Sequence, residues 1–497
     1  MEEYIAAFDI GTTAIKGVLV NNQATISGEY SELLDTYYGE NGEVEQNPAD
    51  WWQGMKEITQ KWWSELNVNP KQIVALTFSG QMEDVISISP KYSNQRAILY
   101  SDTRSEQEAA YIMKKLPFIQ TKIGNTIRPS TPLAKLLWLK ENNAELFDET
   151  ECFVFSSKDY AIYKLTNTFV TDPTTAATTG MMCLNTRGWI PNVLETFELN
   201  GNQLPTICNS DETVGYITKE AAGETGFLES IPVLCGSGDA GASTMGAAAV
   251  NHGDTYFYVG TTGWVATVQD SINQNKSIDN VFNLTHLPEN LNISIAPILN
   301  AGNVHKWAVE TFTNKEANEK YEEFEVLIED SPAGSNGLLF LPYLNGERCP
   351  VRDSDAKGAF WGIGPETKKS DMARSVIEGI CFSYKQLIDL ITNLGDRGLL
   401  TLIGGGSKSS SWCQILADVI GRPVRVPMDS EYMPALGISS SAFVNQRWTE
   451  SYRDFSERFL VTAEAKTYKP DMVNHGVYQR IYQQYLKLYP SLKGIYD

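Results

Sequence analysis

The sequence predicts an α/β protein in which one fold occurs twice. Residues 5–20 read IAAFDIGTTAIKGVLV and residues 256–268 read YFYVGTTGWVATV, so each contains an apolar strand, a Gly-Thr-Thr turn and a second apolar strand. Gly11 and Gly260 lie about half a chain apart. Strand-like and helix-like segments alternate in both halves, as is typical of α/β domains. Two matching hairpins at equivalent points therefore predict two related domains with paired loops.

The length and charge of the chain limit the classes of protein to which it can belong. The chain has 497 residues, which favours two large domains over a single core. Hydrophobic residues make up 42% and charged residues 20%, as in ordinary soluble proteins. The formal net charge is −21, from 40 basic and 61 acidic residues. Such a field repels nucleic acid and anionic lipid, so we expect neither as a partner.

The sequence also predicts a cytoplasmic protein. The start, MEEYIAAFDIG, is acidic and lacks the basic region and longer apolar core of a signal peptide. No apolar stretch approaches the roughly 20 residues of a membrane span. The seven cysteines are scattered without a CxxC pair, which indicates reduced thiols. The four histidines form no close pair, which argues against a zinc site.

Several segments have clear periodicities. Pro48 opens a helix whose four tryptophans we interpret as packing residues rather than a ligand platform. The longest predicted helix covers 371–394, with Ser370 as its N-cap and Gly395 as its stop. Further strands are predicted at 73–80, 86–90 and 97–102, and helices at 105–116 and 133–147; residues 231–250 and 399–421 each predict a strand, a turn and a helix.

The two Gly-Thr-Thr turns are candidate phosphate loops. Glycine lets the backbone approach a ligand closely, and the following N–H and threonine hydroxyl groups can donate to phosphate oxygens. Neither turn has the GxxxxGK[ST] or GxGxxG pattern. Asp9 ends the first strand and Lys16 lies in the return strand, and a carboxylate beside phosphates suits Mg²⁺. The turns predict ATP binding between two domains; the alternative is two ordinary hairpins.

Asp239 is the leading candidate for catalysis. It follows a strand and Gly-Ser-Gly, at the start of a small-residue helix. The functional interpretation is a general base for a substrate hydroxyl, and the alternative is a plain helix N-cap. A helix N-terminus favours the carboxylate form and so lowers its basicity. Phosphoryl transfer tolerates a weak base, since it depends mainly on positioning and charge stabilisation.

Two loops at strand ends predict the acceptor site. SGQMED covers 79–84, and YSDTR contributes Asp102 and Arg104. Polar side chains at strand ends suit sugar hydroxyls, although both loops could simply be solvated. No arginine cluster surrounds these loops in the sequence, so we expect a neutral polyol or ketose rather than an anion. The glycines of GGGSKSSSWCQ could hold a nucleotide base or ribose at a helix N-terminus, or form a tight turn.

Ten segments in order give the chain a family resemblance. They are FDIGTTAIKGVL, EVEQNPADWW, SGQM, YSDTR, GSGDAGA, YVGTTG, LPYLNGERCP, GAFWG, RSVIEGICF and GGGSKSSSWCQILADVIG. Together they resemble the FGGY family of carbohydrate kinases, within the actin/hexokinase/Hsp70 ATPase superfamily. The resemblance implies two ribonuclease-H-like α/β domains with a cleft between them. Residues 1–244 would bind mainly sugar and residues 245–497 mainly nucleotide, and a homodimer is a family expectation.

The resemblance also implies roles for individual residues. Asp239 matches the catalytic base, and Asp9 with Asp239 would lie near Mg²⁺. ATP would be held by Gly11, Thr12, Thr13, Lys16, Gly260, Thr261, Thr262, Gly302, Gly405, Gly406 and Ser410. The sugar would contact Gln81, Met82, Glu83, Asp102 and Asp239.

The sequences of these motifs are most similar to those of the xylulokinase members of the family, so D-xylulose is the first candidate acceptor. One departure is Glu83, where xylulokinases usually have histidine; an ionised glutamate can only accept hydrogen bonds. The same carboxylate argues against gluconate, because two carboxylates repel. Other ketoses, polyols and glycerol stay open, as does a non-catalytic ATP-binding protein or a sugar sensor.

Overall fold

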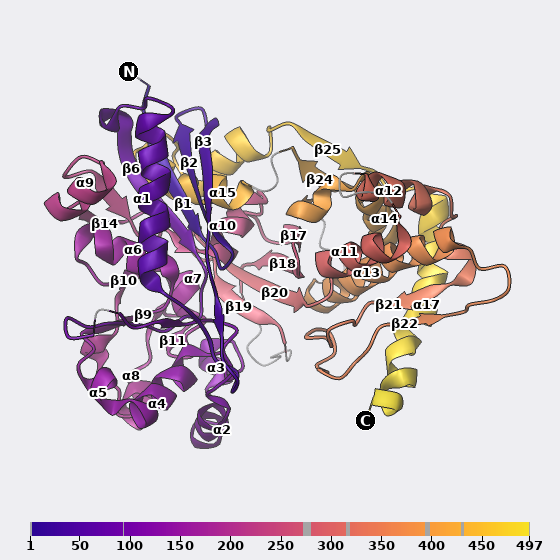
Figure 1. Ribbon diagram of the computed structural model, residues 1–497, viewed down its shortest axis with the longest axis horizontal. Helices are drawn as coiled ribbons and strands as arrows, with labels where there is room; N and C mark the ends of the chain where they lie inside the picture. The colour runs from indigo at the N-terminus through magenta and orange to yellow at the C-terminus, as the bar shows by residue number, and fades with distance from the viewer. Residues whose placement is uncertain are drawn as a thin grey trace.

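Each predicted hairpin forms the centre of a seven-stranded sheet in the computed structural model (Figure 1). The structure describes residues 2–92, 94–271, 280–314, 319–392, 398–428 and 432–496. The two sheets belong to two lobes, drawn mainly in indigo and magenta and mainly in orange and yellow. The two-domain α/β fold is therefore confirmed.

The two sheets share one topology around their hairpins. In the first sheet, β1 pairs antiparallel with β2 and parallel with β6, and β2 pairs antiparallel with β3. In the second, β17 pairs antiparallel with β18 and parallel with β23, and β18 pairs antiparallel with β20. The first sheet comprises β14 (Thr213–Tyr216), β15 (Pro232–Leu234), β6 (Ile73–Gly80), β1 (Tyr4–Ile10), β2 (Ala14–Asn21) and β3 (Ile26–Leu33), with β16 (Ser237–Gly238) on β6. The second comprises β19 (Phe282–Thr285), β20 (Asn292–Ile298), β18 (Gly263–Gln269), β17 (Thr255–Val259), β23 (Leu400–Ile403), β24 (Val424–Pro427) and β25 (Ala465–Tyr468).

The central strand β1 is apolar throughout because both of its faces are covered. Ile5 and Ala7 belong to the core between the two sheets, whereas Ala6 and Phe8 belong to the core beneath helix α1 (Pro48–Ser64). Side chains alternate across a strand, so a strand buried on both faces needs an unbroken apolar run. The tryptophans at 51, 52 and 62 in α1 are buried in this second core, which confirms their packing role.

Two helices that lie far apart in the sequence pack between the sheets. They are α10 (Asp239–Gly246) and α15 (Met433–Asn445), whose apolar side chains join one core with β1 and β17. A Cβ at Gly437 would lie 2.2 Å from the Ala242 carbonyl oxygen, and one at Gly246 would lie 2.1 Å from the Met433 carbonyl oxygen. Only glycine permits this approach. The predicted division at residue 244 falls within α10, and α15 contacts β1 and β6 of the first sheet.

The remaining helices cover the outer faces of the lobes. In the first lobe these include α2 (Glu106–Lys115), α4 (Pro132–Asn142), α5 (Ala144–Asp148), α6 (Ser157–Thr166) and α9 (Lys219–Thr225). In the second they include α11 (Gly302–Phe312), α12 (Lys320–Glu329), α13 (Lys369–Ile391), α14 (Ser410–Ile420) and α17 (Met472–Tyr496). The short helix α7 (Pro173–Ala176) is instead buried and contacts β16 and β19.

Some predicted element boundaries were wrong. The predicted helix 133–147 is two helices, because the Asn143 side chain accepts a hydrogen bond from Leu146 N and starts α5 anew. Of the strand predicted at 97–102, only β8 (Ala97–Ile98) is a strand in the structure. Ser370 does not cap α13: the cap is Lys368, whose backbone N–H donates to Asp371 Oδ2. Gly395, the predicted stop, lies outside the described residues.

Two general features agree with the composition. Each of the seven cysteines is a free thiol. Among the described residues, no helix combines the length and apolarity needed to cross a membrane.

Candidate active site

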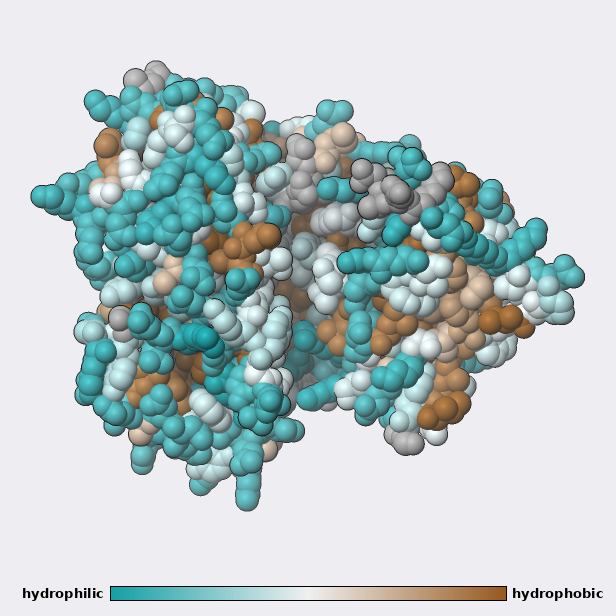
Figure 2. Space-filling view, viewed as in Figure 1, coloured by the Kyte–Doolittle hydropathy of each residue, from teal (hydrophilic) through white to brown (hydrophobic). Residues whose placement is uncertain are grey.

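A small pocket of about 190 Å³ lies at the junction of the two lobes, and Figure 2 shows the surface hollowed between them. We call it the acceptor pocket. It is lined by Thr12, Gln81, Met82, Glu83, Tyr100, Thr178, Asp239, Ala240, Trp264, Phe282, Leu284, Ile295 and Arg348. Five of these residues, Thr12, Gln81, Met82, Glu83 and Asp239, are predicted site residues, although they come from three separate segments.

Asp239 lies at the edge of the acceptor pocket and is the first residue of α10. The N-cap of α10 is Gly238, so the interpretation of Asp239 as a plain N-cap is wrong. Burial raises the pKa of Asp239 to about 7, and repulsion from the Asp9 carboxylate adds to this shift. The expectation of lowered basicity at a helix N-terminus was therefore also wrong, because desolvation outweighs the helix dipole. A carboxyl with this pKa is suited to accept a proton near neutral pH.

Asp9 supplies the second carboxylate near Asp239. It lies in β1 opposite Lys16 of β2. Burial raises the pKa of Asp9, and the charge of Lys16 opposes this rise. Two desolvated carboxylates that repel each other fit a divalent cation, since Mg²⁺ binds protein through one or two carboxylates and otherwise through water and phosphate. Among the described residues, no group of three or more His, Cys, Asp or Glu side chains is arranged around a metal position.

A buried ion cluster fixes the backbone just before Asp239. Asp172 Oδ1 accepts a hydrogen bond from Gly238 N at 3.2 Å, and Asp172 Oδ2 accepts one from Ser237 Oγ at 3.2 Å. Lys158 Nζ lies 3.1 Å from Asp172 Oδ1 and 2.6 Å from Asp159 Oδ1, and all three side chains are fully buried. The sequence analysis missed this cluster, which holds residues 237 and 238 in place beneath the candidate base.

A chain of side chains positions the first Gly-Thr-Thr turn. Thr12 Oγ1 donates to Gln81 Oε1 at 2.6 Å, and Gln81 Nε2 donates to Gln46 Oε1 at 3.2 Å. Gln46 Nε2 donates back to the Thr12 carbonyl at 2.7 Å, and Trp51 Nε1 donates to Gln46 Oε1 at 3.0 Å. Gln81 therefore holds the turn besides lining the acceptor pocket. In the same turn Gly11 N donates to Ala14 O at 3.1 Å.

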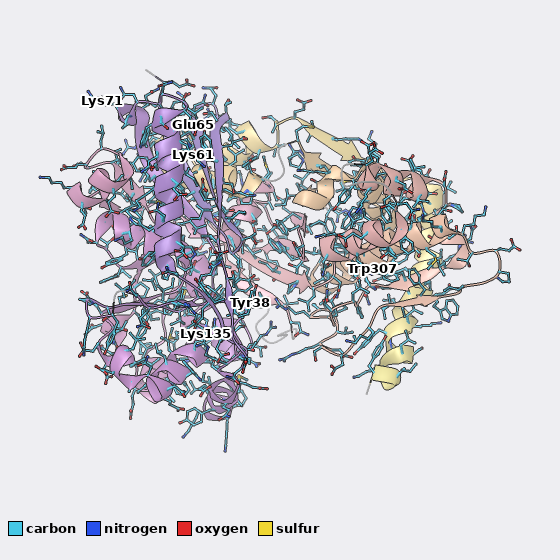
Figure 3. All side chains as sticks on the ribbon, viewed as in Figure 1. Tyr38, Lys61, Glu65, Lys71, Lys135 and Trp307 are labelled. Carbon is cyan, nitrogen blue, oxygen red and sulfur yellow. The ribbon has the colours of Figure 1, made fainter. Side chains whose placement is uncertain are left out.

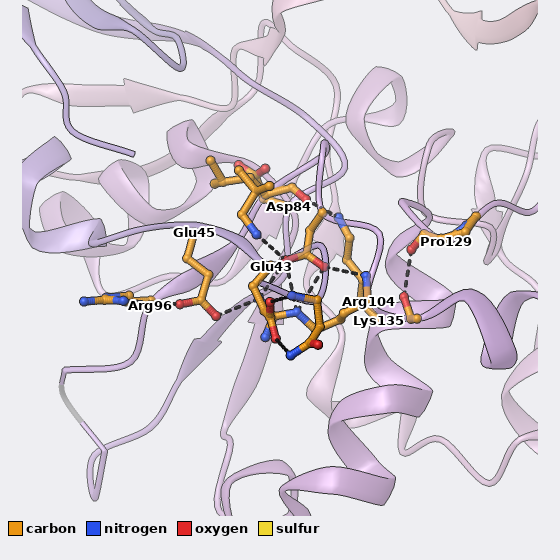
Figure 4. A network of polar contacts seen from close by, with 12 residues as sticks. Glu43, Glu45, Asp84, Arg96, Arg104, Pro129 and Lys135 are labelled. Atoms are coloured by element: carbon orange, nitrogen blue, oxygen red, sulfur yellow. Dashed lines mark hydrogen bonds and ion pairs between the residues drawn. The ribbon is translucent and has the colours of Figure 1, made fainter. Parts of the chain in front are cut away.

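Asp102 does not reach the acceptor pocket. It is fully buried and binds Arg104, with Arg104 Nη2 at 2.6 Å from Asp102 Oδ2 and 2.7 Å from Glu45 Oε1 (Figure 4). The Val44 N–H also donates to Asp102 Oδ2 at 2.7 Å. Asp102 therefore supports the loop region behind the pocket, and its predicted sugar contact is not seen.

Glu83 lies in the acceptor pocket with an unusual backbone. Its φ of 63° is in the left-handed region, and the buried Lys135 Nζ donates to its carbonyl oxygen at 2.7 Å. Burial raises the pKa of Glu83 to about 7, while the charges of Lys135, Arg128 and Arg348 act in the opposite direction. The sequence shows no cluster of arginines around the acceptor loops, but the fold brings Arg128 and Arg348 from distant segments close enough to act on Glu83. Arg348 lines the pocket from the opposite lobe.

A larger pocket of about 990 Å³ lies in the second lobe, and we call it the nucleotide pocket. The second Gly-Thr-Thr turn forms one wall. Gly302 N donates to Gly260 O at 3.0 Å and Asn303 N donates to Thr261 O at 2.9 Å, so the turn is joined to the start of α11. A Cβ at Gly302 would lie 2.2 Å from Gly260 O, which explains the glycine at this position.

The glycine loop after β23 forms the opposite wall. Gly404 has φ of 94° and a Cβ there would lie 2.7 Å from Val259 O. Gly405 and Gly406 line the nucleotide pocket, but the predicted residues Ser410 and Thr262 do not and are exposed.

Glu325 occupies the N-terminus of α14. Ser411 N donates to Glu325 Oε2 at 3.2 Å, and the Ser409 hydroxyl donates to Glu325 Oε1. Ser409, rather than Ser410, caps α14 and lines the pocket. Because a carboxylate already accepts from this helix end, its amides are not all directed at a ligand. The local charge suits a base or ribose better than phosphate.

Aromatic residues that the sequence analysis left unassigned complete both pockets. Trp307, which Figure 3 labels on α11, and Trp412 line the nucleotide pocket. Trp264 lines the acceptor pocket and stacks on Tyr258 with ring centroids 3.9 Å apart. Trp264 follows the Gly-Thr-Thr turn in the quoted motif, so its position there was the available signal. The hairpin β17–β18 thus contributes to both pockets.

Comparison with known proteins assigns the family. Residues 4–246 match the N-terminal domain of the FGGY family of carbohydrate kinases, and residues 258–445 match its C-terminal domain. The chain belongs to the FGGY family of carbohydrate kinases. This FGGY protein is therefore an ATP-dependent sugar kinase, and the family implies the actin/hexokinase-like fold.

Relatives of this FGGY kinase match it over nearly its whole length. It is 29% identical to the xylulose kinase of Bacillus subtilis, over 99% of this chain and 98% of that protein. It is 28% identical to a gluconokinase of the same organism, over 87% and 85% of the two chains. Crystal structures of a gluconate kinase and a ligand-bound xylulose kinase from Lactobacillus acidophilus each match with a TM-score of 0.89 and 27% identity. Both cover 99% of this chain, and 98% and 99% of their own chains, respectively.

Proposed function

We propose that this kinase transfers the γ-phosphoryl group of ATP to a hydroxyl of a small sugar, with D-xylulose as the first acceptor and D-xylulose 5-phosphate as the product. The main support is the position of Asp239, which combines a pKa near 7 with a place on the wall of the acceptor pocket. Asp9 lies in β1, and the first Gly-Thr-Thr turn joins β1 to β2. β1 pairs with β6, which also pairs with β16, the strand directly before Asp239.

The proposed chemistry divides the tasks of the reaction among these groups. Asp239 orients the acceptor hydroxyl and accepts its proton as the new oxygen–phosphorus bond forms and the bond from the γ-phosphorus to the bridging oxygen breaks, which releases ADP. Phosphoryl transfer depends chiefly on positioning and charge stabilisation, so a carboxyl with near-neutral pKa is sufficient as the base. The two Gly-Thr-Thr turns hold phosphates through their backbone N–H and hydroxyl groups. The base and ribose lie in the nucleotide pocket against the glycine loop and the tryptophans.

Asp9 and Asp239 would hold Mg²⁺, directly or through water. When bound, the ion offsets the negative charge that gathers on the phosphates during transfer. Lys16, opposite Asp9, adds a further positive charge on this side of the site. Closing of the lobes over both substrates would exclude water and limit hydrolysis of ATP.

Fewer observations support the identity of the acceptor than support the class of reaction. Full-length similarity to xylulose kinases supports D-xylulose. Other ketoses, polyols, glycerol and gluconate are alternatives, and Glu83 is the residue expected to discriminate among them. We place the activity in the cytoplasm.

The test is a coupled ADP-release assay across D-xylulose, L-xylulose, D- and L-ribulose, glycerol, ribitol, D-arabitol and gluconate. Release that depends on one sugar names the acceptor, and D-xylulose is the expected one. Bound ATP with no release for any acceptor would contradict the proposed kinase activity and favour a sensor.

A further inference from the structure

We infer that Lys135 is a positioning residue for sugar recognition, because its buried ammonium group holds the two loops that carry Glu83 and Tyr100 on the wall of the acceptor pocket. Lys135 lies on α4 in the first lobe, where Figure 3 labels it, and its side chain is fully buried. The inference rests on the proposed function, since it names a residue that shapes the acceptor site of the same reaction.

The ammonium group of Lys135 joins two loops that are separate in the sequence. Lys135 Nζ donates to the Glu83 carbonyl oxygen at 2.7 Å and to the Leu99 carbonyl oxygen at 2.6 Å. Next to these residues the loops also meet through their backbones, where Val85 N donates to Ile98 O at 2.9 Å and Ile98 N donates to Val85 O at 3.0 Å. The lysine therefore extends the connection between the loops from this bridge toward the residues that line the pocket.

The backbone of Glu83 explains why this connection matters for the pocket. Its φ of 63° lies in the left-handed region, which residues with a side chain rarely adopt. Such a conformation persists only where the surroundings hold it. The hydrogen bond from Lys135 fixes the peptide group that follows Glu83, and a rotation of this backbone would turn the carboxyl group away from its place in the pocket. Lys135 therefore controls the direction of the Glu83 side chain.

Tyr100 is held by the same lysine and by its neighbour Asp84. Tyr100 directly follows Leu99, whose carbonyl oxygen accepts from Lys135. The Tyr100 N–H donates to Oδ1 of the buried Asp84 at 3.1 Å. Burial raises the pKa of Asp84, and the charge of Lys135 opposes this rise. The lysine thus favours the ionised carboxylate, which is the stronger acceptor for the Tyr100 N–H.

Helix α4 gives the lysine a rigid base. Leu133, Leu136 and Leu137 of this helix pack in one hydrophobic core with Val85 and Ile98, the two residues of the bridge between the loops. Close packing of this kind leaves little freedom for the helix to shift relative to the loops. The position of the ammonium group is therefore set by the fold, before any sugar binds.

The charge of Lys135 also acts on the carboxyl group of Glu83. The charged groups that act on Glu83 are the cations Lys135, Arg128 and Arg348 and the carboxyl groups of Asp84 and Asp239. Among the cations, Lys135 has the largest effect on the pKa of Glu83. Burial lowers the pKa of Lys135 to about 8, so the lysine is charged at neutral pH. Removing this charge should raise the pKa of Glu83 further.

The first test is steady-state kinetics of full-length Lys135→Met. The KM for the acceptor that the ADP-release assay identifies, with D-xylulose tried first, should rise about tenfold, because both loops lose their support. The kcat and the KM for ATP should stay within about threefold of the wild type. Lys140→Met is the matched control. Lys140 also lies on α4 and donates to two carbonyl oxygens, of Phe197 at 3.2 Å and Glu198 at 3.0 Å, but neither residue lines the pocket.

The second test needs no sugar. Carbon-13 NMR of labelled glutamate carboxyl groups follows the titration of Glu83 between about pH 5 and 9, and Glu83→Gln identifies its signal. The midpoint should rise by about one pH unit in Lys135→Met and stay unchanged in Lys140→Met. Lys135→Gln keeps an N–H donor without the charge, so its acceptor KM should rise only about threefold while the shift of the midpoint persists. This variant carries both tests if Lys135→Met does not fold.

Four results would overturn the inference. They are an unchanged acceptor KM in every folded Lys135 variant, an unshifted Glu83 midpoint in those variants, an equal rise in the KM for ATP, and the same changes in Lys140→Met. The failure of the proposed function gives a different result. A shifted midpoint without ADP release from any acceptor would contradict the kinase proposal alone. ADP release with D-xylulose, but an unchanged KM and midpoint in the Lys135 variants, would contradict the positioning role alone.

Discussion

Asp172 accepts a hydrogen bond from the backbone N–H of Gly238, the residue directly before Asp239, with an oxygen–nitrogen distance of 3.2 Å. The same carboxylate faces the buried ammonium of Lys158 at 3.1 Å. A buried charge pair beneath a catalytic residue can fix its position without touching the substrate. We infer that Asp172 is in this sense a positioning residue for Asp239, the proposed base.

Asp172→Asn should lower kcat by about 10- to 100-fold with little change in KM, because small displacements of a reacting group are costly. Asp159→Asn is the matched control, since Asp159 also binds Lys158, at 2.6 Å, but does not contact residue 238. Both variants lose a partner of a buried lysine, so urea unfolding should give similar losses of stability. Equal effects on kcat in the two variants would show that Asp172 acts only through stability.

Gly302→Ala should weaken ATP binding by about tenfold or more, because a Cβ at 2.2 Å from Gly260 O forces α11 away from the second Gly-Thr-Thr turn. Gly405→Ala is the control, since a Cβ there meets no atom within 4 Å. Both variants can be compared by nucleotide titration. An equal or larger loss at Gly405 would mean that its backbone, and not the α11 contact, controls nucleotide affinity.

Glu325→Ala should raise the KM for ATP several-fold and cost about 1 kcal/mol of stability, the usual effect of losing a helix cap. The carboxylate of Glu325 binds both Ser409 and Ser411 at the start of α14. Glu322→Ala provides the comparison, because Glu322 lines the same pocket without such a contact. If steady-state kinetics showed the same change in both variants, net charge rather than capping would be responsible.

Glu83 should give the acceptor KM a pH dependence. Its pKa is raised to about 7 by burial, so Glu83 is neutral and able to donate below pH 7, and becomes an acceptor only as the pH rises above it. Because the pKa of Glu83 is raised, its ionisation costs more in the folded state than in the unfolded state. Folding stability therefore falls as the pH rises from about 4.5 to 7, whereas a salt-bridged carboxylate would make it rise with pH. Glu83→Gln should flatten the KM profile between about pH 6 and 8 and the stability profile between about pH 4.5 and 7. Persistence of the wild-type KM profile in this variant would assign the pH dependence to another group.

The sequence was sufficient to predict the repeated hairpins, because a strand buried on both faces and a Gly-Thr-Thr turn are local patterns. It also pointed to Asp239 and Glu83, which line the acceptor pocket, and to Gly302, which lines the nucleotide pocket. It could not identify the buried Lys158–Asp172 cluster or the approach of Arg128 to the acceptor pocket, since tertiary packing alone brings these segments together. Asp102 shows the converse: a polar residue after a strand can be directed at a neighbouring arginine instead of a ligand.

Asp239→Asn tests the central claim most directly. The substitution keeps the shape of the side chain and removes the proton acceptor. Sugar-dependent ADP release should fall by about 100- to 10,000-fold, the range for loss of a general base. ATP affinity and thermal stability should stay close to those of the wild type. Near-normal turnover by Asp239→Asn, with ATP and sugar bound as usual, would contradict the assignment of Asp239 as the base.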